Sequence, residues 1–502
     1  MFGLHPFAAA PFADAGVTSI DYSMTADAGS FALTGQAVDL NVGRNFTAAS
    51  GSFSLSGQTI NLTKVVSMSA ANGSFALTGQ TVNLNKAVKL SAANGSFSLS
   101  GQTVTLKKGV KLGAANGSFT LSGQTVNLNK ALNITAANGS FTLTGSAVTF
   151  GQAFNIPLVH GTFTLSLQGA AKLITEVIDG GVFTVTGQAA TLEKGVNITA
   201  DSGSFTLTGQ NVSLIQGFGF TADSGSFTLI GQDVELKKAL NITADSGSFA
   251  LTGQDVGLNK GAFITADSGS FALTGQSANF NKAVNIAADS GSFALTGQDV
   301  TLKRVVNLSA DSGSFALTGQ NVTLNVGINM SADNGSFALS GQDVTLGRVI
   351  NLSADSGSFT LTGQNVTLRK GFSIAADSGS FTLTGQAANL NKGLNIAADS
   401  GSFVLTGQAA VFGVSMAAGS GSFALTGQDV TLNVGKIMSV DSGSFTLTGN
   451  AVTFDIGVQV EGVSISALVG GVTVFGLIKP DQNPSWSAIS PNQDPNWQQL
   501  VA

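Results

Sequence analysis

The stretch GSFALTGQDVTL occupies residues 291–302, and near-copies of it recur along most of the chain. The phenylalanine of the GSF triplet marks each copy. It recurs every 22 residues, apart from steps of 20 residues between Phe163 and Phe183 and between Phe403 and Phe423. A fixed period in this range is typical of a solenoid or another repeat array, and not of several separate globular domains.

Within one copy, apolar and polar residues alternate in three short pieces. Phe293 and Leu295 belong to the first piece, Val300 and Leu302 to the second, and residues 306–309 form the third. Alternation with a period of two predicts half-buried β-strands. Gly, Asn, Asp and Ser separate the pieces and favour turns. The pattern therefore predicts an all-β fold.

Two arrangements of these strands fit the pattern. The first is a β-solenoid of about 20 rungs, with three short strands per 22-residue rung and a rise of about 4.8 Å, giving a rod of roughly 95 Å. The alternative is an antiparallel β-meander of hairpins, in which Leu295 pairs with Val300 across Gly297 and Gln298. We favour the solenoid because Gly-Gln recurs in nearly every copy while its neighbours vary. Stacked amide side chains bond to their own copies above and below.

The repeat divides the chain into three parts. Residues 1–24 precede the array as an N-terminal arm or attachment segment. The β-repeat array spans 25–456 and is irregular at 151–182 and 411–422. Residues 457–502 follow as a C-terminal cap and Trp-Pro tail.

Composition argues against an enzyme. The absence of Cys excludes disulfides and thiolate metal sites, and two His make a His-rich metal centre improbable. Phosphate-binding loops, zinc-protease motifs and nucleophile elbows are also absent. His160 lies in the first irregular stretch, and we interpret it as a structural residue. We predict no catalytic residues and no organic cofactor.

Charge is segregated along the chain. Residues 41–175 contain no Asp or Glu, but they contain nine Lys and Arg. Such a basic stretch attracts polyanions. Nucleic acid is nevertheless not a predicted partner, because the stretch lacks aromatic residues other than those expected in the core.

An aspartate occupies the same position in ten successive copies after this stretch. These residues are Asp201, Asp223, Asp245, Asp267, Asp289, Asp311, Asp333, Asp355, Asp377 and Asp399. In a solenoid their carboxylates line one edge at intervals of about 4.8 Å. Two interpretations stay open. The Asp side chains accept backbone N–H bonds in Asx-type turns, or divalent cations such as calcium bind along the row.

The most apolar stretch, 462–478, raises the question of a membrane span. It is short for a transmembrane helix, and its Gly and β-branched residues alternate around Gly470 and Gly471. We therefore predict two strands around a Gly-Gly turn and no membrane span.

Aromatic residues lie next to prolines at both ends of the chain. Phe7 and Phe12 belong to the echo PFAAAPFA, and Trp486 and Trp497 to the endings NPSW and DPNW. Such segments suit extended docking onto a partner. We predict these four residues as interaction residues, with a structural cap for the last rung as the alternative for the C-terminal pair.

The tandem GSFxLTGQ units and the endings NPSWSAI and DPNWQQL resemble structural proteins of tailed bacteriophages. This resemblance implies a virion fibre or decoration that is made in the host cytoplasm, self-associates, and contacts other virion proteins and the host cell surface. A weaker similarity is to curli-like amyloid subunits, which also stack units of similar length. The start of the chain lacks the features of a secretory signal, which favours the virion. A bacterial cell-surface adhesin and an extracellular amyloid-like filament subunit remain the alternatives.

Overall fold

The computed structural model describes residues 24–474 with short gaps. The gaps are 41–43, 64–65, 87–88, 156–159, 168–175, 179–180, 193–196, 201, 216–217, 239, 261, 283, 433–436, 441–443, 450, 455–458, 462–464 and 470–471. All elements in the described ranges are β-strands. The chain forms two compact units, Met1–Gln276 (unit 1) and Ser277–Ala502 (unit 2).

The strands of unit 1 are 3 to 19 residues long. They are β1 (Met24–Ala26), β2 (Ser30–Leu40), β3 (Arg44–Ala48), β4 (Ser52–Leu62), β5 (Val66–Ala70), β6 (Ser74–Lys86), β7 (Lys89–Ala92), β8 (Ser96–Lys108), β9 (Lys111–Ala114), β10 (Ser118–Ala136), β11 (Ser140–Asn155), β12 (Thr162–Leu167), β13 (Glu176–Ile178), β14 (Val182–Leu192), β15 (Asn197–Ala200), β16 (Ser204–Leu214), β17 (Phe218–Ala222), β18 (Ser226–Ile230), β19 (Asp233–Leu236), β20 (Leu240–Ala244), β21 (Ser248–Thr252), β22 (Asp255–Leu258), β23 (Ala262–Ala266) and β24 (Ser270–Thr274).

Unit 2 continues the numbering. Its strands are β25 (Ser277–Phe280), β26 (Val284–Ala288), β27 (Ser292–Thr296), β28 (Asp299–Ala310), β29 (Ser314–Thr318), β30 (Asn321–Ala332), β31 (Ser336–Ser340), β32 (Asp343–Ala354), β33 (Ser358–Ala376), β34 (Ser380–Ala398), β35 (Ser402–Ala418), β36 (Ser422–Leu432), β37 (Ile437–Val440), β38 (Ser444–Gly449), β39 (Ala451–Phe454), β40 (Gln459–Glu461), β41 (Ile465–Val469) and β42 (Val472–Val474).

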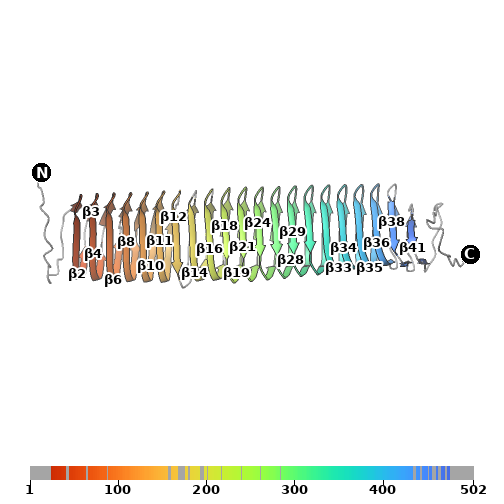
Figure 1. The fold of residues 1–502 in the computed structure, drawn as a ribbon, viewed down its shortest axis with the longest axis horizontal. Helices are drawn as coiled ribbons and strands as arrows, with labels where there is room; N and C mark the ends of the chain where they lie inside the picture. The colour runs from red at the N-terminus through yellow and green to blue at the C-terminus, as the bar shows by residue number, and fades with distance from the viewer. Residues whose placement is uncertain are drawn as a thin grey trace, which may run out of the picture. The chain divides into compact units, whose positions relative to one another are not determined.

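Within each unit, successive copies of the repeat lie side by side (Figure 1), and their strands pair in parallel and in register. In unit 1, β6 pairs with β8 so that Phe75 lies opposite Phe97. In unit 2, β29 pairs with β31 so that Phe315 lies opposite Phe337. Each residue thus faces its equivalent 22 residues away, and each unit is a β-solenoid. The antiparallel meander is wrong, because these parallel pairs join different copies and not the pieces of one copy.

The three predicted pieces are the three sides of a rung. In one copy of unit 1 they are separate strands, β18, β19 and β20. In other copies the corners bend the chain without interrupting the strand, and β33 runs through all three sides over 19 residues. The prediction of three short strands therefore holds for the sides of the rung, while the number of separate strands varies from copy to copy.

Each side contributes two apolar side chains to the core. One copy of unit 2 shows the set, which consists of Phe337, Leu339, Val344, Leu346, Leu352 and Ala354, all at most 2% exposed. The phenylalanine rings form a stack, in which Phe315 and Phe337 have centroids 4.8 Å apart and planes 6° apart. Full burial of such a side chain contributes about 1.5–3 kcal/mol. A rung obtains this stabilisation only when neighbouring rungs cover both of its faces, because its side chains are then fully buried.

Glycine is required where backbones of successive rungs approach closely. A Cβ placed on Gly95, before the GSF phenylalanine, would collide with the carbonyl oxygen of Gly73 on the preceding rung. A Cβ on Gly101, in the Gly-Gln corner, would come within 2.5 Å of the Gly79 carbonyl oxygen. Neither position has a positive φ, so the reason for glycine is the stacking distance and not an unusual turn.

The first irregular stretch keeps the stacking. Strand β12 pairs in parallel with β11 and β14. The Phe163 ring therefore lies 5.3 Å from that of Phe141 and 4.7 Å from that of Phe183. Leu167 lies opposite Gly145 and takes the position of the missing corner glycine. The core column of phenylalanines continues through this part of unit 1.

The second copy with 20 residues in place of 22 lacks its two residues at a corner of the rung. Between β34 and β35 the register shifts after Leu390, which lies opposite Phe412. Leu394 then lies opposite Val414, and the pairing resumes in its usual form. Two residues are therefore lost at this corner, and a shift of two keeps the period-two alternation of the strand in phase.

The apolar stretch near the C-terminus also joins the stack. Strands β41 and β42 are present, as predicted, and they pair in parallel with β38 and β39 of the preceding copy. Ile465 takes the place of the phenylalanine, because it lies opposite Phe445. Among the residues that the structure describes, no helix has the length and apolar character needed to span a membrane.

Candidate functional site

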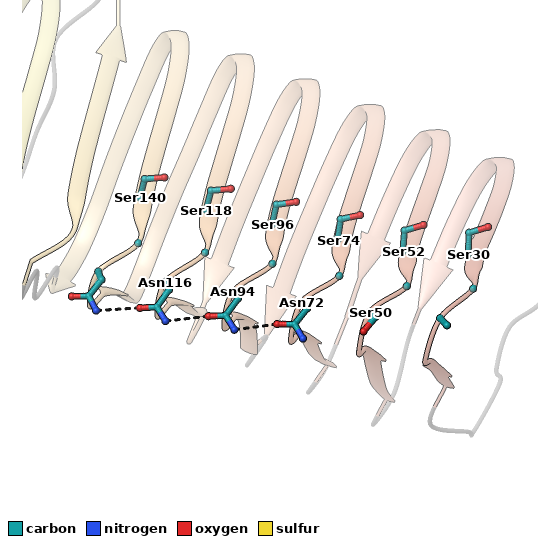
Figure 2. A pocket seen from close by; sticks show the side chains of 18 of the residues that line it. Ser30, Ser50, Ser52, Asn72, Ser74, Asn94, Ser96, Asn116, Ser118 and Ser140 are labelled. Atoms are coloured by element: carbon teal, nitrogen blue, oxygen red, sulfur yellow. Dashed lines mark hydrogen bonds between the residues drawn. The ribbon is translucent and has the colours of Figure 1, made fainter.

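A polar groove of about 950 Å³ runs along one corner of unit 1, before the GSF triplet (Figure 2). Its lining extends from Ala28 to Thr162 and repeats the same few residue types, Asn or Ser followed by Gly and Ser. Because each rung contributes one set, the groove presents the same polar atoms at every step of the stack.

An asparagine ladder forms one wall of the groove. The Asn94 Nδ2 atom donates a hydrogen bond of 3.0 Å to Asn72 Oδ1, and Asn116 and Asn138 continue the ladder at 3.1 Å each. The backbone holds each amide in place, since the N–H of Asn94 donates to the Ala71 carbonyl oxygen at 2.7 Å. Each amide also keeps one N–H and one lone pair for another partner.

A row of serines runs alongside this ladder. Figure 2 shows Ser74, Ser96, Ser118 and Ser140 at equivalent places on successive rungs. Their backbones are held by bonds such as that from the Ser96 N–H to the Gly73 carbonyl oxygen, at 3.1 Å. The lining contains hydroxyl and amide groups but no carboxylate, imidazole or ammonium group. This groove can donate and accept hydrogen bonds, but it offers no general base and no activated nucleophile.

A second surface of unit 1 is strongly cationic. The basic patch consists of five exposed lysines, Lys86, Lys89, Lys107, Lys108 and Lys111. Lys86 lies opposite Lys108, Lys108 opposite Lys130, and Lys89 opposite Lys111 on neighbouring rungs. The surrounding residues 41–175 contain no Asp or Glu, so no acidic residue of this stretch offsets the charge. A patch of this kind attracts anionic partners.

The predicted row of aspartates forms a column on the surface. In unit 2 this acidic column consists of Asp289, Asp311, Asp333, Asp355, Asp377 and Asp399, all exposed. Backbone hydrogen bonds connect its members, as from the Ser356 N–H to the Asp333 carbonyl oxygen at 2.7 Å. Unit 1 carries Asp223, Asp245 and Asp267 at the same position.

The Asx-turn interpretation finds no support at three of the six positions of this column. The carboxylates of Asp311, Asp333 and Asp355 accept no hydrogen bond within the described ranges, and the bonds at this corner join backbone atoms. In the described part of the chain, no three or more His, Cys, Asp or Glu residues are grouped so that they can hold a metal ion. Binding of calcium or another divalent cation along the column stays a prediction.

In a different column of unit 2, carboxylates of successive rungs are separated by neutral side chains. Asp299, Asn321, Asp343 and Asn365 alternate along it, one per rung. Asn321 Nδ2 donates to Asp299 Oδ1 at 2.7 Å, and Asn365 Nδ2 donates to Asp343 Oδ1 at 2.8 Å. Each carboxylate thus accepts a bond from a neutral neighbour. The alternation of Asp and Asn after Gly-Gln was the sequence signal for this arrangement.

In the part of the chain that the structure describes, the amide ladders join Asn side chains and not the predicted Gln side chains. Gln80, Gln102 and Gln298 are exposed. Gln contributes its backbone at this corner, as where the Asn321 N–H donates to the Gln298 carbonyl oxygen at 2.9 Å. The solenoid was therefore predicted correctly, but the side-chain ladder used to argue for it was assigned to the wrong residue.

Several predicted site residues lie outside the described residues. These are Phe7, Phe12, Asp201, Trp486 and Trp497. His160 is described and exposed, and its backbone N–H donates to the Ala137 carbonyl oxygen at 2.7 Å. This position is equivalent to that of the ladder asparagines, which fits its interpretation as a structural residue.

Comparison of the chain with protein-family models, curated proteins and solved structures gave no match.

Proposed function

We propose that this chain is a non-enzymatic structural fibre or rod of a phage virion that presents one terminus for attachment to the host. The observation that carries the proposal is the parallel, in-register stacking within each unit. The side chains that recur in every copy pack against their own equivalents, as Phe337 does between Phe315 and Phe359 with ring distances of 4.8 Å. Such residues serve the scaffold, because their partners are copies of themselves.

The surfaces support a role without catalysis. The groove of unit 1 is lined by neutral amide and hydroxyl groups that repeat from rung to rung. A catalytic centre requires a few unlike groups with matched proton affinities at one place. Repetition of one neutral set along a corner fits a binding or spacing surface better than a reaction site.

The resemblance of the tandem units and of the Trp-Pro tail to phage structural proteins supports the virion as the location. In this role the chain is made in the host cytoplasm and binds other virion proteins, with the host cell surface as a further partner. Nucleic acid and membrane lipid are not among the proposed partners.

One observation favours a second candidate, an extracellular amyloid-like filament subunit. The ladder Asn285–Asn307–Asn329–Asn351 of unit 2, with bonds of 2.9 to 3.1 Å, is the kind of amide ladder that stabilises cross-β filaments. A cell-surface adhesin shares the scaffold but adds a specific ligand.

Electron microscopy separates these candidates. Purified full-length protein is imaged after negative staining, and antibodies against it are used for immunogold labelling of phage particles and host cells. We expect discrete rods of uniform length and gold on the virions. Long filaments of variable length would support the filament subunit. Label confined to uninfected cell envelopes would contradict the virion proposal.

A further inference from the structure

Two exposed surfaces of this chain carry opposite charges, and the charges on both surfaces recur with the same spacing from rung to rung. The basic patch of unit 1 stacks Lys86 on Lys108 and Lys89 on Lys111 across successive rungs. The acidic column of unit 2 stacks one exposed Asp per rung, for example Asp333, then Asp355. Both repeats are set by the same parallel pairing, which places neighbouring rungs about 4.8 Å apart.

The imbalance of charge within the chain is large. Residues 41–175 carry nine basic and no acidic residues. The rest of the chain carries 13 Lys and Arg against 28 Asp and Glu. One copy therefore presents a cationic stretch and a strongly anionic remainder, which is the charge distribution that draws copies of one chain together in a staggered arrangement.

The two surfaces match in spacing as well as in sign. When a Lys column meets an Asp column with an identical rise, each ammonium group can lie beside a carboxylate over several rungs without loss of register. A polymer with its own repeat, such as a nucleic acid, matches at only some of these positions. The like-charge repulsion within each column is also relieved by such pairing.

We propose that the basic patch of one copy binds the acidic column of unit 2 of a second copy, side by side. The contact uses different surfaces on the two partners, so it is heterologous. Each added copy uses one of these two surfaces and leaves the other free, so the assembly is open-ended. This inference goes beyond the proposed fibre role and does not depend on it.

The patch lacks what a single-stranded nucleic acid would add to the contact. Large hydrophobic side chains that are exposed in the described residues are Val182, Ile230 and Phe263, and none of them belongs to the patch. Stacking of bases on aromatic side chains is a main source of affinity in such complexes. The surface provides charge alone, which the acidic column complements.

Sedimentation velocity of the full-length protein tests the proposal first. At low ionic strength, about 20 mM, charges are screened only beyond roughly 20 Å or more, whereas at about 1 M the screening length is near 3 Å. We expect species larger than the monomer at low salt and a monomer at high salt. A wild-type protein that is monomeric at both ionic strengths would overturn the proposal.

Charge reversal then tests the two surfaces. The patch variant carries Lys86→Glu, Lys108→Glu and Lys111→Glu. The column variant carries Asp333→Lys, Asp355→Lys and Asp377→Lys. The chain itself already stacks carboxylates in one column and ammonium groups in another, so both variants should fold, which circular dichroism checks. We expect each variant alone to associate at least about tenfold more weakly than the wild type.

Mixing the two variants provides the decisive measurement. The acidic patch of one variant now complements the basic column of the other, so we expect the mixture to recover association at low salt. A mixture that stays monomeric while both variants are folded would overturn the proposal.

The matched control is Lys260→Glu with Lys282→Glu, two exposed cations at the same position of the repeat but outside the basic patch. We expect this control to associate like the wild type, and loss of association equal to that of the patch variant would count against the assignment. Monomeric wild type that instead binds single-stranded DNA or dextran sulfate through the patch would assign the surface to a polyanion and would also overturn the proposal.

Discussion

Two corners of the same repeat can be compared, one in unit 1 and one in unit 2. At residues 93–95 of unit 1 the corner reads Ala-Asn-Gly, and at residues 355–357 of unit 2 it reads Asp-Ser-Gly. The backbones are equivalent, because the N–H of Asn94 and that of Ser356 each donate to the preceding rung at 2.7 Å. The side chains differ, since the asparagines form a ladder and the aspartates stand as a column of charges.

The difference shows which atoms determine the corner. The glycine and the inter-rung backbone bonds are common to both, so they fix the turn. The outward side chains vary with little effect on the path of the chain. One small change accompanies the charge, because the bond from Asp355 N–H to the Ala332 carbonyl is 3.2 Å long, against 2.9 Å from Ala93 to Ala70. Surface chemistry is thus varied on a constant scaffold.

Truncation of a core phenylalanine to alanine should lower the free energy of unfolding by a similar amount beneath the two corners. Phe97→Ala and Phe337→Ala each remove a ring that is 1% exposed and stacked on both sides. We expect a loss of about 3–5 kcal/mol in each case, since a cavity is left in a packed column. Guanidinium unfolding followed by circular dichroism measures this. Thr78→Ser and Thr362→Ser, at exposed positions, are the controls, and a small effect at either phenylalanine would contradict a shared core.

The corner glycine should be the next most sensitive position. In Gly95→Ala and Gly357→Ala the new Cβ collides with the carbonyl oxygen of Gly73 and Gly335, respectively. Because that atom belongs to the backbone, it cannot move aside cheaply, and we expect a loss of about 1–3 kcal/mol. Thermal melts measure it.

A glycine with space around it provides the control. A Cβ on Gly113 meets only Thr135 Oγ1, at 3.7 Å. We expect Gly113→Ala to be neutral or slightly stabilising. If Gly113→Ala were as damaging as Gly95→Ala, close stacking would not be the reason for the corner glycines.

The asparagine ladder should contribute less to the free energy of unfolding than the corner glycines do. Asn94→Ala removes two side-chain hydrogen bonds on an exposed edge, and we expect a loss of about 1 kcal/mol of unfolding free energy. The equivalent change in unit 2, Ser356→Ala, removes no side-chain bond in the described ranges and should leave stability unchanged. Chemical denaturation of the two variants side by side compares the corners, and equal losses would show that the ladder is not stabilising.

The smallest expected effect concerns the acidic column. Asp355→Asn removes one charge from between two like charges, so we expect a slightly higher melting temperature at low ionic strength. The gain should disappear at about 1 M salt, where the screening length is near 3 Å. A gain that persists at high salt would indicate a cause other than repulsion. Addition and chelation of calcium in the same melts tests whether cations occupy the column, in which case chelation lowers the melting temperature of the wild type.

The solenoid was predictable because its cause is local and repeated. The alternation around Phe293 and Val300 places the same side chains inward in every copy, and the 22-residue step aligns the copies. The same 22-residue spacing predicted that the aspartates form a column and that the lysines of the basic stretch lie on neighbouring rungs. These features depend only on position within the repeat.

The groove and the ladders were not predicted. The ladder from Asn72 to Asn138 involves few copies, so it is a weak periodic signal beside Gly-Gln. The groove is lined by residues of successive rungs, and its shape depends on how two sides of a rung meet, which the repeat alone does not specify. The exposed Gln side chains show that a residue can recur for its place at a corner, without a side-chain ladder.

The register shift between Leu390 and Leu394 has an evolutionary consequence. A whole copy can be gained or lost by unequal recombination between near-identical gene segments, and the sequence on either side meets a new neighbour with the same faces. Small errors at the crossover fall into turns that already accept a loss of two residues. The length of such a protein is therefore a trait that a lineage can adjust in steps, without searching for a new fold.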